Sequence, residues 1–325
     1  MAAGGIVKKR DSLGDFAVRT PYEPIIVNRP ARDRGGPFKL VSFNAAGGRQ
    51  VELIVDRLRR PPLAGAAAIF LMEVDWRLPR SGNLEIAAEI AARLGMSLGF
   101  QPALAFAKSE DSPPHGFFGL AILSAVPLRS ARAMPVPATY ERTIGRFTGV
   151  PRRAFRIFAP AALSAVVTWN GHSIHLGALH LESHASPAGR DLQVASVLSG
   201  FPSGPAIMAG DFNTTTTELS YRSAVVEVIR RIVVEPRRFR DPERYEPLFE
   251  RLRSAGFVFD GANVPLRPTF TFTKVVPPVM RPKLDWLCTR GPRPIPGTAA
   301  VVPARRSLLS PRFSDHDFVV CDFDP

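Results

Sequence analysis

The sequence predicts one α/β domain in which mixed β-sheets lie beneath helices. Three observations support this class. Short apolar runs of strand length alternate with segments of helical periodicity along the 325 residues. The predicted strands are joined both by a hairpin turn and by helical crossovers, and no repeat, linker or change of composition divides the chain. Residues 1–37, rich in Gly, Pro and Arg, are expected to form an irregular lead-in to a folded domain over residues 38–325.

The first half of this domain alternates strands with two helices. Apolar residues recur at helical spacing over residues 51–59, and a proline pair ends that helix. The same periodicity over residues 84–94 predicts a second helix, which a glycine closes. Short apolar runs, typical of buried strands, predict strands over residues 38–44, 66–72, 98–106 and 118–124.

The second half contains a hairpin and the closing strands. Asn170-Gly171 is a strong two-residue turn signal, so the apolar runs on either side are expected to pair as antiparallel strands. Helical spacing predicts helices over residues 191–198, 219–234 and 247–252. Apolar or alternating patterns predict strands over residues 162–169, 173–182, 205–209, 269–274, 283–288 and 317–323.

The net charge indicates a polyanionic partner but does not identify which kind. The chain has 42 Lys and Arg against 29 Asp and Glu, a formal charge of +13, which attracts nucleic acid, anionic lipid or phosphorylated metabolites. A genome of high GC content produces the same surplus of arginine. Residues 129–156 carry seven arginines and one acid, which indicates either a flap facing phosphate or a solvated basic surface.

Several features favour a cytoplasmic protein. No apolar run reaches the length of a membrane span, and the first ten residues lack the apolar core of a signal peptide. Cys288 and Cys321 both lie in apolar strand-like runs, where buried free thiols are expected rather than a disulfide.

The strand predicted over residues 205–209 ends abruptly on an acid and an amide. Gly210 relaxes the backbone just before Asp211. Asp211 and Asn213 stand two residues apart, so their side chains point to the same side if the backbone stays extended. Ligands of α/β sheets bind beyond the carboxyl ends of strands, and an acid with an amide suits the activation of water. The alternative is that Asp211 or Asn213 caps the turn that follows.

Other apolar strands also end at polar residues. An open sheet gathers its strand ends at one edge, so these side chains can converge on one site. Carboxylate and amide oxygens without a cysteine cluster suit Mg²⁺ or Mn²⁺, and histidine beside aspartate is a pairing that holds one imidazole tautomer. The residues concerned are Asn44, Glu73, His180, Glu182, Asp285, Asp315 and His316.

These motifs together resemble those of the endonuclease/exonuclease/phosphatase superfamily, and they follow the family's order. The resemblance implies a four-layered α/β sandwich of two packed mixed sheets flanked by helices, with the catalytic domain over residues 38–325. Leu120 and Met72 depart from the family pattern, which has Asn and Gln at these two positions. The matching motifs are SFN at 42–44, LMEV at 71–74, GLAILS at 119–124, HLES at 180–183, GDFN at 210–213, KLDW at 283–286 and SDH at 314–316.

The HLES motif continues into a helix that carries Arg190 and Gln193. This extended pattern is similar to tyrosyl-DNA phosphodiesterases and to many bacterial members of the superfamily. We interpret Glu182 and Arg190 as a buried ion pair that shapes the loop between them.

The resemblance also implies a metal site. Glu73 is expected to be the principal ligand of Mg²⁺ or Mn²⁺. Asn44 and Asp315 are expected to help complete the contacts to the metal and the substrate.

Five further residues receive catalytic roles from the resemblance. Asp211 would orient or deprotonate the attacking water, and Asn213 would support both the water and the phosphate. His316, paired with Asp285, would contact the phosphate or handle a proton. His180 would donate a hydrogen bond to a phosphate oxygen. Either Asp211 or His316 is the base, and the sequence leaves this choice open.

The predicted function is hydrolysis of phosphoester bonds by a divalent-metal-dependent phosphodiesterase or nuclease, acting as a monomer. Arg152 and Arg153 are its predicted substrate-binding residues, and nucleic acid is the candidate substrate. One alternative is a phosphatase, or a phospholipase of the sphingomyelinase type, acting on inositol phosphates or lipids. Another is an inactive phosphate-binding module, against which Asp211 argues because binding alone needs no group that activates water.

Overall fold

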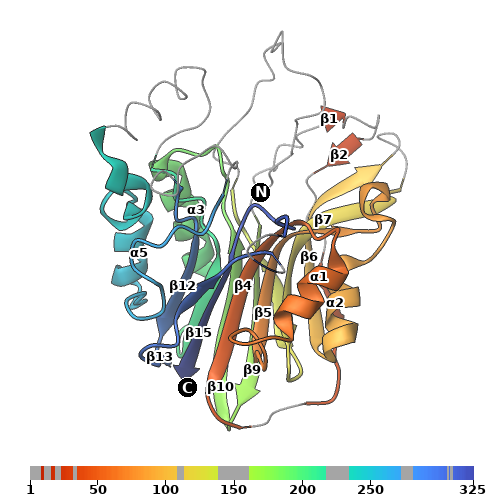
Figure 1. The fold of residues 1–325 in the computed structure, drawn as a ribbon, viewed down its shortest axis with the longest axis horizontal. Coiled ribbons are helices and arrows are strands. Elements are labelled where there is room, and N and C mark those ends of the chain that lie inside the picture. Colours follow the sequence, from red (N-terminus) through yellow and green to blue (C-terminus); the bar gives the residue numbers. More distant parts are fainter. Residues whose placement is uncertain are drawn as a thin grey trace.

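Two packed sheets form the centre of the molecule in the computed structural model. Helices α1 (Val51–Leu58) and α2 (Ile86–Leu94) cover the outer face of one sheet, and α3 (Pro187–Gly200) and α5 (Leu248–Ser254) cover the other (Figure 1). This arrangement confirms the predicted four-layered sandwich. The structure describes residues 9–10, 16–18, 23–31, 35–107, 113–137, 161–216, 234–271, 281–305, 307 and 310–325.

The larger sheet, sheet A, has the order β1-β2-β6-β7-β5-β4-β15-β13 in the described part of the chain, with β3 beside β6 and β14 beside β15. It is mixed, because β4 and β5 are parallel and their other neighbours are antiparallel. Its strands are β1 (Lys9–Arg10), β2 (Phe16–Val18), β3 (Ile25–Val27), β4 (Phe38–Gly47), β5 (Ala68–Trp76), β6 (Ser97–Ala107), β7 (Gly116–Ser124), β13 (Arg293–Pro294), β14 (Ala300–Val302) and β15 (Phe318–Asp324).

The smaller sheet, sheet B, has the order β12-β11-β10-β9-β8. Only β10 and β11 run parallel, and α3 makes the crossover between them. Its strands are β8 (Arg129–Met134), β9 (Ala161–Trp169), β10 (His172–His180), β11 (Ala206–Asp211) and β12 (Asp285–Arg290).

Side-chain alternation along the strands separates three apolar layers. In β11, Ile207 and Ala209 face the core between the sheets, whereas Met208 packs toward α3 and α5. Continuing this period of two, Asp211 faces the space between the sheets. The register then sets His180 and Asp285 directly beside Asp211 on the neighbouring strands. The end of sheet B therefore presents a row of polar residues above the inter-sheet core.

Most predicted elements are present, with shifts of a few residues at their ends. The hairpin turn is confirmed, since Asn170 and Gly171 both have positive φ, 49° and 79°. The strand expected over residues 269–274 is a single bridge between Phe270 and His316, because its backbone bonds to residues 315 and 317 rather than to a sheet. Residues 272–274 lie outside the described residues, as do residues 219–233 of a predicted helix.

Two further expectations concern the lead-in and the thiols. Residues 9–10, 16–18 and 25–27 form three short strands at the edge of sheet A, while the division of the chain at residue 38 stays a prediction. Cys288 and Cys321 are both free and buried, as expected. Among the described helices, none combines the length and apolarity that crossing a membrane requires.

Candidate active site

Two groups of buried side chains meet at the shared edge of the two sheets. Glu73, His180 and Asp211 form the first group, and Asp211, Asp285 and His316 form the second. Within each group, one ligand atom of every residue lies within 4.8 Å of the others. Asp211 belongs to both groups, so these five acids and histidines form one continuous site.

Asn44 joins the two carboxylates of the first group. Its Nδ2 donates hydrogen bonds to Oε1 of Glu73 (3.1 Å) and to Oδ2 of Asp211 (2.9 Å). Its Oδ1 accepts the backbone N–H of Ala46. In this orientation the amide holds the two acids side by side and directs its nitrogen toward them. The predicted role of Asn44 as a metal ligand stays a prediction.

A bulge in β5 directs Glu73 into the site. Strict alternation places Met72 toward the inter-sheet core and the next side chain toward the helices. The pairing register shifts between Leu71 and Val74, and Glu73 has a positive φ of 53°. An extra residue of this kind re-aims a side chain, and here it brings the carboxylate of Glu73 to Asn44. The strand then continues beyond the predicted end to Trp76.

The backbone around Asp211 accepts only glycine at position 210. Gly210 has φ +149°, and a Cβ there would lie 1.8 Å from the carbonyl oxygen of Leu179. The backbone does not stay extended as far as Asn213, whose φ is +50°, so alternation does not determine the direction of this side chain. The N–H of Asn213 donates instead to Oδ1 of Asp211, and its Nδ2 donates to the carbonyl of Leu181.

Asp211 therefore combines the two roles weighed for it. Its Oδ1 caps the turn through the N–H of Asn213 (2.9 Å). Its Oδ2 faces the site, where it accepts the amide of Asn44. Because the first contact fixes the plane of the carboxylate, the second oxygen keeps a defined position.

His316 is oriented by contacts on three sides. Nδ1 of His316 lies 2.8 Å from Oδ2 of Asp285, and Nε2 lies 3.6 Å from Oδ2 of Asp211. The ring of Phe270 packs against the imidazole with centroids 4.7 Å apart. Ser314 accepts the N–H of His316 and donates to the carbonyl of Asn44, so the SDH motif is tied to the end of β4. Phe270 and Ser314 were missed as site residues, although the SDH motif includes the serine.

His180 completes the other side of the site. Its Nε2 lies 3.7 Å from Oε1 of Glu73 and 3.8 Å from Oδ2 of Asp211. This nitrogen is buried and has no hydrogen-bond partner within the described part of the chain. A buried nitrogen between two acids suits contact with a cation or a phosphate oxygen.

Burial and mutual charge shift the pKa values of these groups. Burial raises the pKa of Asp211 to about 7; the charge of Asp285 also raises it, whereas His316 lowers it. Burial alone would lower the pKa of His316, but the carboxylates of Asp285 and Asp211 raise it to about 10. Burial lowers the pKa of His180. These shifts favour the charged form of His316 and the protonated form of Asp211, compared with an ordinary histidine and aspartate.

The remaining predicted site residues are placed differently. Asp315 is half-buried and belongs to neither group; its carbonyl accepts the N–H of Thr271, and its metal role stays a prediction. Arg152 and Arg153 lie outside the described residues.

The expected ion pair between Glu182 and Arg190 is wrong. Nε and Nη2 of Arg190 donate to the two carboxylate oxygens of Glu246 at 3.1 and 2.5 Å. Glu182 accepts from Nε2 of Gln193 instead, because that residue faces the HLES loop from the same helix. No spacing pattern links positions 190 and 246, so sequence reasoning missed Glu246.

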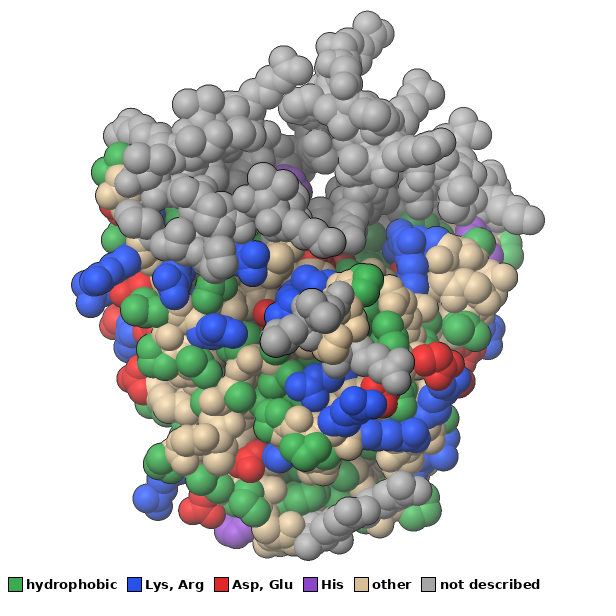
Figure 2. Space-filling view, in the orientation of Figure 1, with side chains coloured by type: hydrophobic (Ala, Val, Ile, Leu, Met, Phe, Trp, Pro, Cys, Tyr) green, Lys and Arg blue, Asp and Glu red, His purple; other side chains and the backbone are tan. Residues whose placement is uncertain are grey.

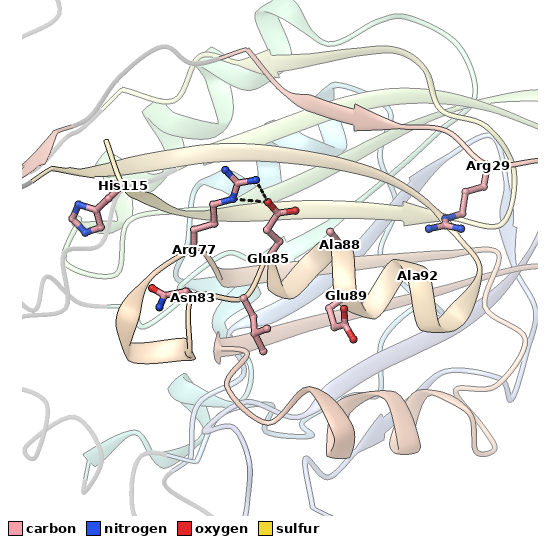
Figure 3. Close-up of a pocket in the computed structure, with 9 residues that line it drawn as sticks. Arg29, Arg77, Asn83, Glu85, Ala88, Glu89, Ala92 and His115 are labelled. Carbon is pink, nitrogen blue, oxygen red and sulfur yellow. Dashed lines mark hydrogen bonds and ion pairs between the residues drawn. The ribbon is translucent and has the colours of Figure 1, made fainter. Parts of the chain in front are cut away.

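A separate pocket of about 680 Å³ runs along α2 (Figure 3). Arg77 and Glu85 form an ion pair on its wall, and His115 and Arg29 lie at its two ends. None of the predicted site residues lines this pocket, so the candidate site is defined by side-chain convergence rather than by the pocket.

Comparison with known proteins places the whole described site inside one family model. The model of the endonuclease/exonuclease/phosphatase family matches residues 41–316. A sequence comparison with curated proteins gives no match.

The fold is similar to several solved structures. An endonuclease/exonuclease/phosphatase from Beutenbergia cavernae has 16% identity and a TM-score of 0.57, over 88% of this chain and 71% of that one. D. rerio TDP2 complexed with a single-strand DNA product has 18% identity and a TM-score of 0.55, over 89% of this chain and 100% of that one. The human Nocturnin catalytic domain with bound sulfate has 15% identity and a TM-score of 0.51, over 94% and 98%. At these identities the likeness is one of fold.

Proposed function

The chain belongs to the endonuclease/exonuclease/phosphatase family, and on this premise we propose that it is a divalent-metal-dependent phosphodiesterase. One observation carries the proposal: five buried acids and histidines form two groups that share Asp211 at the common edge of the two sheets. A purely structural cluster would satisfy its own polar atoms. Here Nε2 of His180 and Oδ1 of Asp285 are buried without hydrogen-bond partners among the described residues, which supports a site that receives a ligand.

The donor set fits a hard cation. Glu73 and Asp211 offer carboxylate oxygens, and His180 offers a nitrogen within 4.8 Å of them. Glu73 would hold Mg²⁺ or Mn²⁺, with Asp315 and Asn44 as the further predicted ligands, and the nitrogen of His180 would remain for a phosphate oxygen. A bound cation would offset the negative charge of a phosphate ester and polarise its oxygens.

The chain's own residues supply the proton transfer. We assign the base to Asp211, whose Oδ2 faces the site while its Oδ1 is occupied by the N–H of Asn213. Oδ2 would take a proton from water as the water oxygen bonds to phosphorus and the ester oxygen leaves. The carboxylates of Asp285 and Asp211 raise the pKa of His316, which favours its charged form and disfavours it as that base. Held by Asp285, its Nε2–H would instead stabilise charge on the phosphate.

Nucleic acid is the proposed substrate class. The charge of +13 favours a polyanion, and Figure 2 shows Lys and Arg side chains across the visible face. If Arg152 and Arg153 contact substrate phosphates, changing both to Glu should weaken DNA binding alike for all sequences. The wild-type affinity should also fall with salt, because each phosphate contact releases counterions. An affinity that does not change with salt concentration would favour a small phosphoester as the substrate instead.

A panel of phosphoesters tests the proposal. The substrates are bis-p-nitrophenyl phosphate, single- and double-stranded DNA, RNA, 5′-tyrosyl DNA, sphingomyelin and inositol phosphates, each with Mg²⁺, Mn²⁺ or EDTA. We expect phosphodiester hydrolysis with metal, and a loss of roughly 100-fold in kcat for Asp211→Asn. Hydrolysis of only inositol phosphates or sphingomyelin would support the phosphatase or phospholipase alternative. No turnover of any substrate would overturn the proposed function.

A further inference from the structure

Helix α3 packs on the outer face of sheet B. Two of its buried side chains, Arg190 and Gln193, bond to the segment that follows His180 and to Glu246. Arg190 and Gln193 are both fully buried, although arginine and glutamine are mostly exposed in proteins. They belong to the extended HLES motif, and neither belongs to the groups that form the active site. Their contacts therefore need a different explanation from catalysis itself.

Arg190 forms a two-pronged ion pair with Glu246, the residue that lies two positions before α5. Both side chains are fully buried, and Nη1 of Arg190 also donates to the carbonyl of Ala185. Replacing such a buried pair by apolar residues often leaves stability unchanged or raises it. Packing between α3 and α5 thus gives no reason for charged groups at this place.

Glu246 extends the contact to the loop after Asp211. Its Oε1 accepts the N–H of Thr216 at 2.7 Å. Thr216 has a positive φ of 58°, a conformation that a threonine adopts only when its surroundings hold it there. Arg238 donates to both the hydroxyl and the carbonyl of Thr216. The far end of the Asn213–Thr216 loop is therefore fixed through side chains outside the site.

Gln193 holds the second loop in the same way. Its Oε1 accepts the N–H of Glu182, and its Nε2 donates to Oε2 of the same residue. The two loops are also bonded to each other. The N–H of Leu181 donates to the carbonyl of Asp211, and the carbonyl of Leu181 accepts from Nδ2 of Asn213. One helix thus supports the loop after Asp211 and the loop after His180.

We propose that Arg190 and Glu246 are positioning residues, which hold the Asn213–Thr216 loop so that Asp211 and Asn213 keep their catalytic geometry. The inference rests on the proposed function. The pair acts through the N–H of Thr216, which lies five positions after Asp211 in the sequence, and neither member belongs to the groups that form the site. The carboxylate of Glu246 is the essential part, because it bonds both to Arg190 on α3 and to the N–H of Thr216 in the loop.

Two variants separate positioning from stability. Arg190→Met with Glu246→Leu removes both charges together, so thermal stability should stay near wild type, but the acceptor that Glu246 provides for the N–H of Thr216 is lost. Glu246→Gln keeps an oxygen for that N–H and leaves the guanidinium of Arg190 without a counter-charge, so its Tm should fall. Asp191→Ala is the matched control, because Asp191 pairs with Arg251 between α3 and α5 and bonds to neither loop within the described residues.

The measurements are kcat and KM with bis-p-nitrophenyl phosphate, Tm, and hydrogen exchange of the Thr216 N–H. The double variant should lose roughly 10- to 100-fold in kcat, with KM little changed and faster exchange at Thr216. Glu246→Gln should keep most of kcat and slow exchange despite its lower Tm, and Asp191→Ala should keep wild-type kcat.

The inference is overturned if Glu246→Gln loses more kcat than the double variant. If kcat follows Tm in both variants, or if the double variant keeps wild-type kcat, the pair has a structural role only. A wild-type protein that hydrolyses none of the panel overturns the proposed function and this inference together. An active wild type with an unaffected double variant overturns this inference alone.

Discussion

The contact between Asp285 and His316 allows the sharpest test of the catalytic assignment. Both side chains are buried, and Oδ2 of Asp285 lies 2.8 Å from Nδ1 of His316. A hydrogen bond to a charged group contributes about 1.5–3 kcal/mol. If this energy is expressed in the transition state, its loss corresponds to roughly 10- to 100-fold in rate. We therefore expect Asp285→Asn to lower kcat by that factor.

The double variant shows whether the two residues act as one unit. His316→Ala should lower kcat by roughly 100-fold or more, the scale for losing a donor that stabilises charge in the transition state. Because Asp285 acts only through His316, adding Asp285→Asn should change kcat by no more than about twofold further. Initial rates with bis-p-nitrophenyl phosphate and Mn²⁺ measure all four proteins of the cycle.

Thr289→Val on the same strand is the control for this cycle. The hydroxyl of Thr289 is buried at the far end of β12, where it donates to the carbonyls of Ala206 and Pro292. Its loss should lower Tm without changing kcat. Fully additive losses for Asp285 and His316, or equal losses for the control, would refute the reasoning.

Three further predictions follow from the site. Glu73→Gln should lower the affinity for Mg²⁺ or Mn²⁺ and the activity, with Tm nearly unchanged; calorimetric titration of the metal measures the affinity. Full activity of the wild type in EDTA would contradict the metal assignment. In EDTA, the stabilisation from the raised pKa of His316 should be complete below pH 6.5 and should disappear as the pH rises to about 10. The Tm of the wild type should therefore fall across this window, and the Tm of His316→Gln should fall less steeply. Gly210→Ala should destabilise by more than about 4 kcal/mol in urea unfolding, because its Cβ would overlap the Leu179 carbonyl, whereas Gly200→Ala meets only the flexible end of Met134 and should be tolerated.

Much of the fold was predictable from contiguous residues. Strand and helix periods, the Asn170-Gly171 turn and the glycine after α2 are local signals, and the structure contains the corresponding elements. The strand ending at Asp211 was predictable for the same reason. The segments that differ, such as the single bridge at Phe270, depend on partners that are distant in sequence.

The sequence by itself determined the family, the fold class and which residue types stand at the strand ends, because these are properties of order and spacing. Only the tertiary structure decided how they meet. Asn44 and Asp211 are 167 positions apart, yet they share a hydrogen bond because two sheets end at one edge. Glu73 enters the site through a bulge that no period of two predicts. Arg190 bonds to Glu246 rather than to the nearby Glu182, since the packing of α3 against α5 selects the partner.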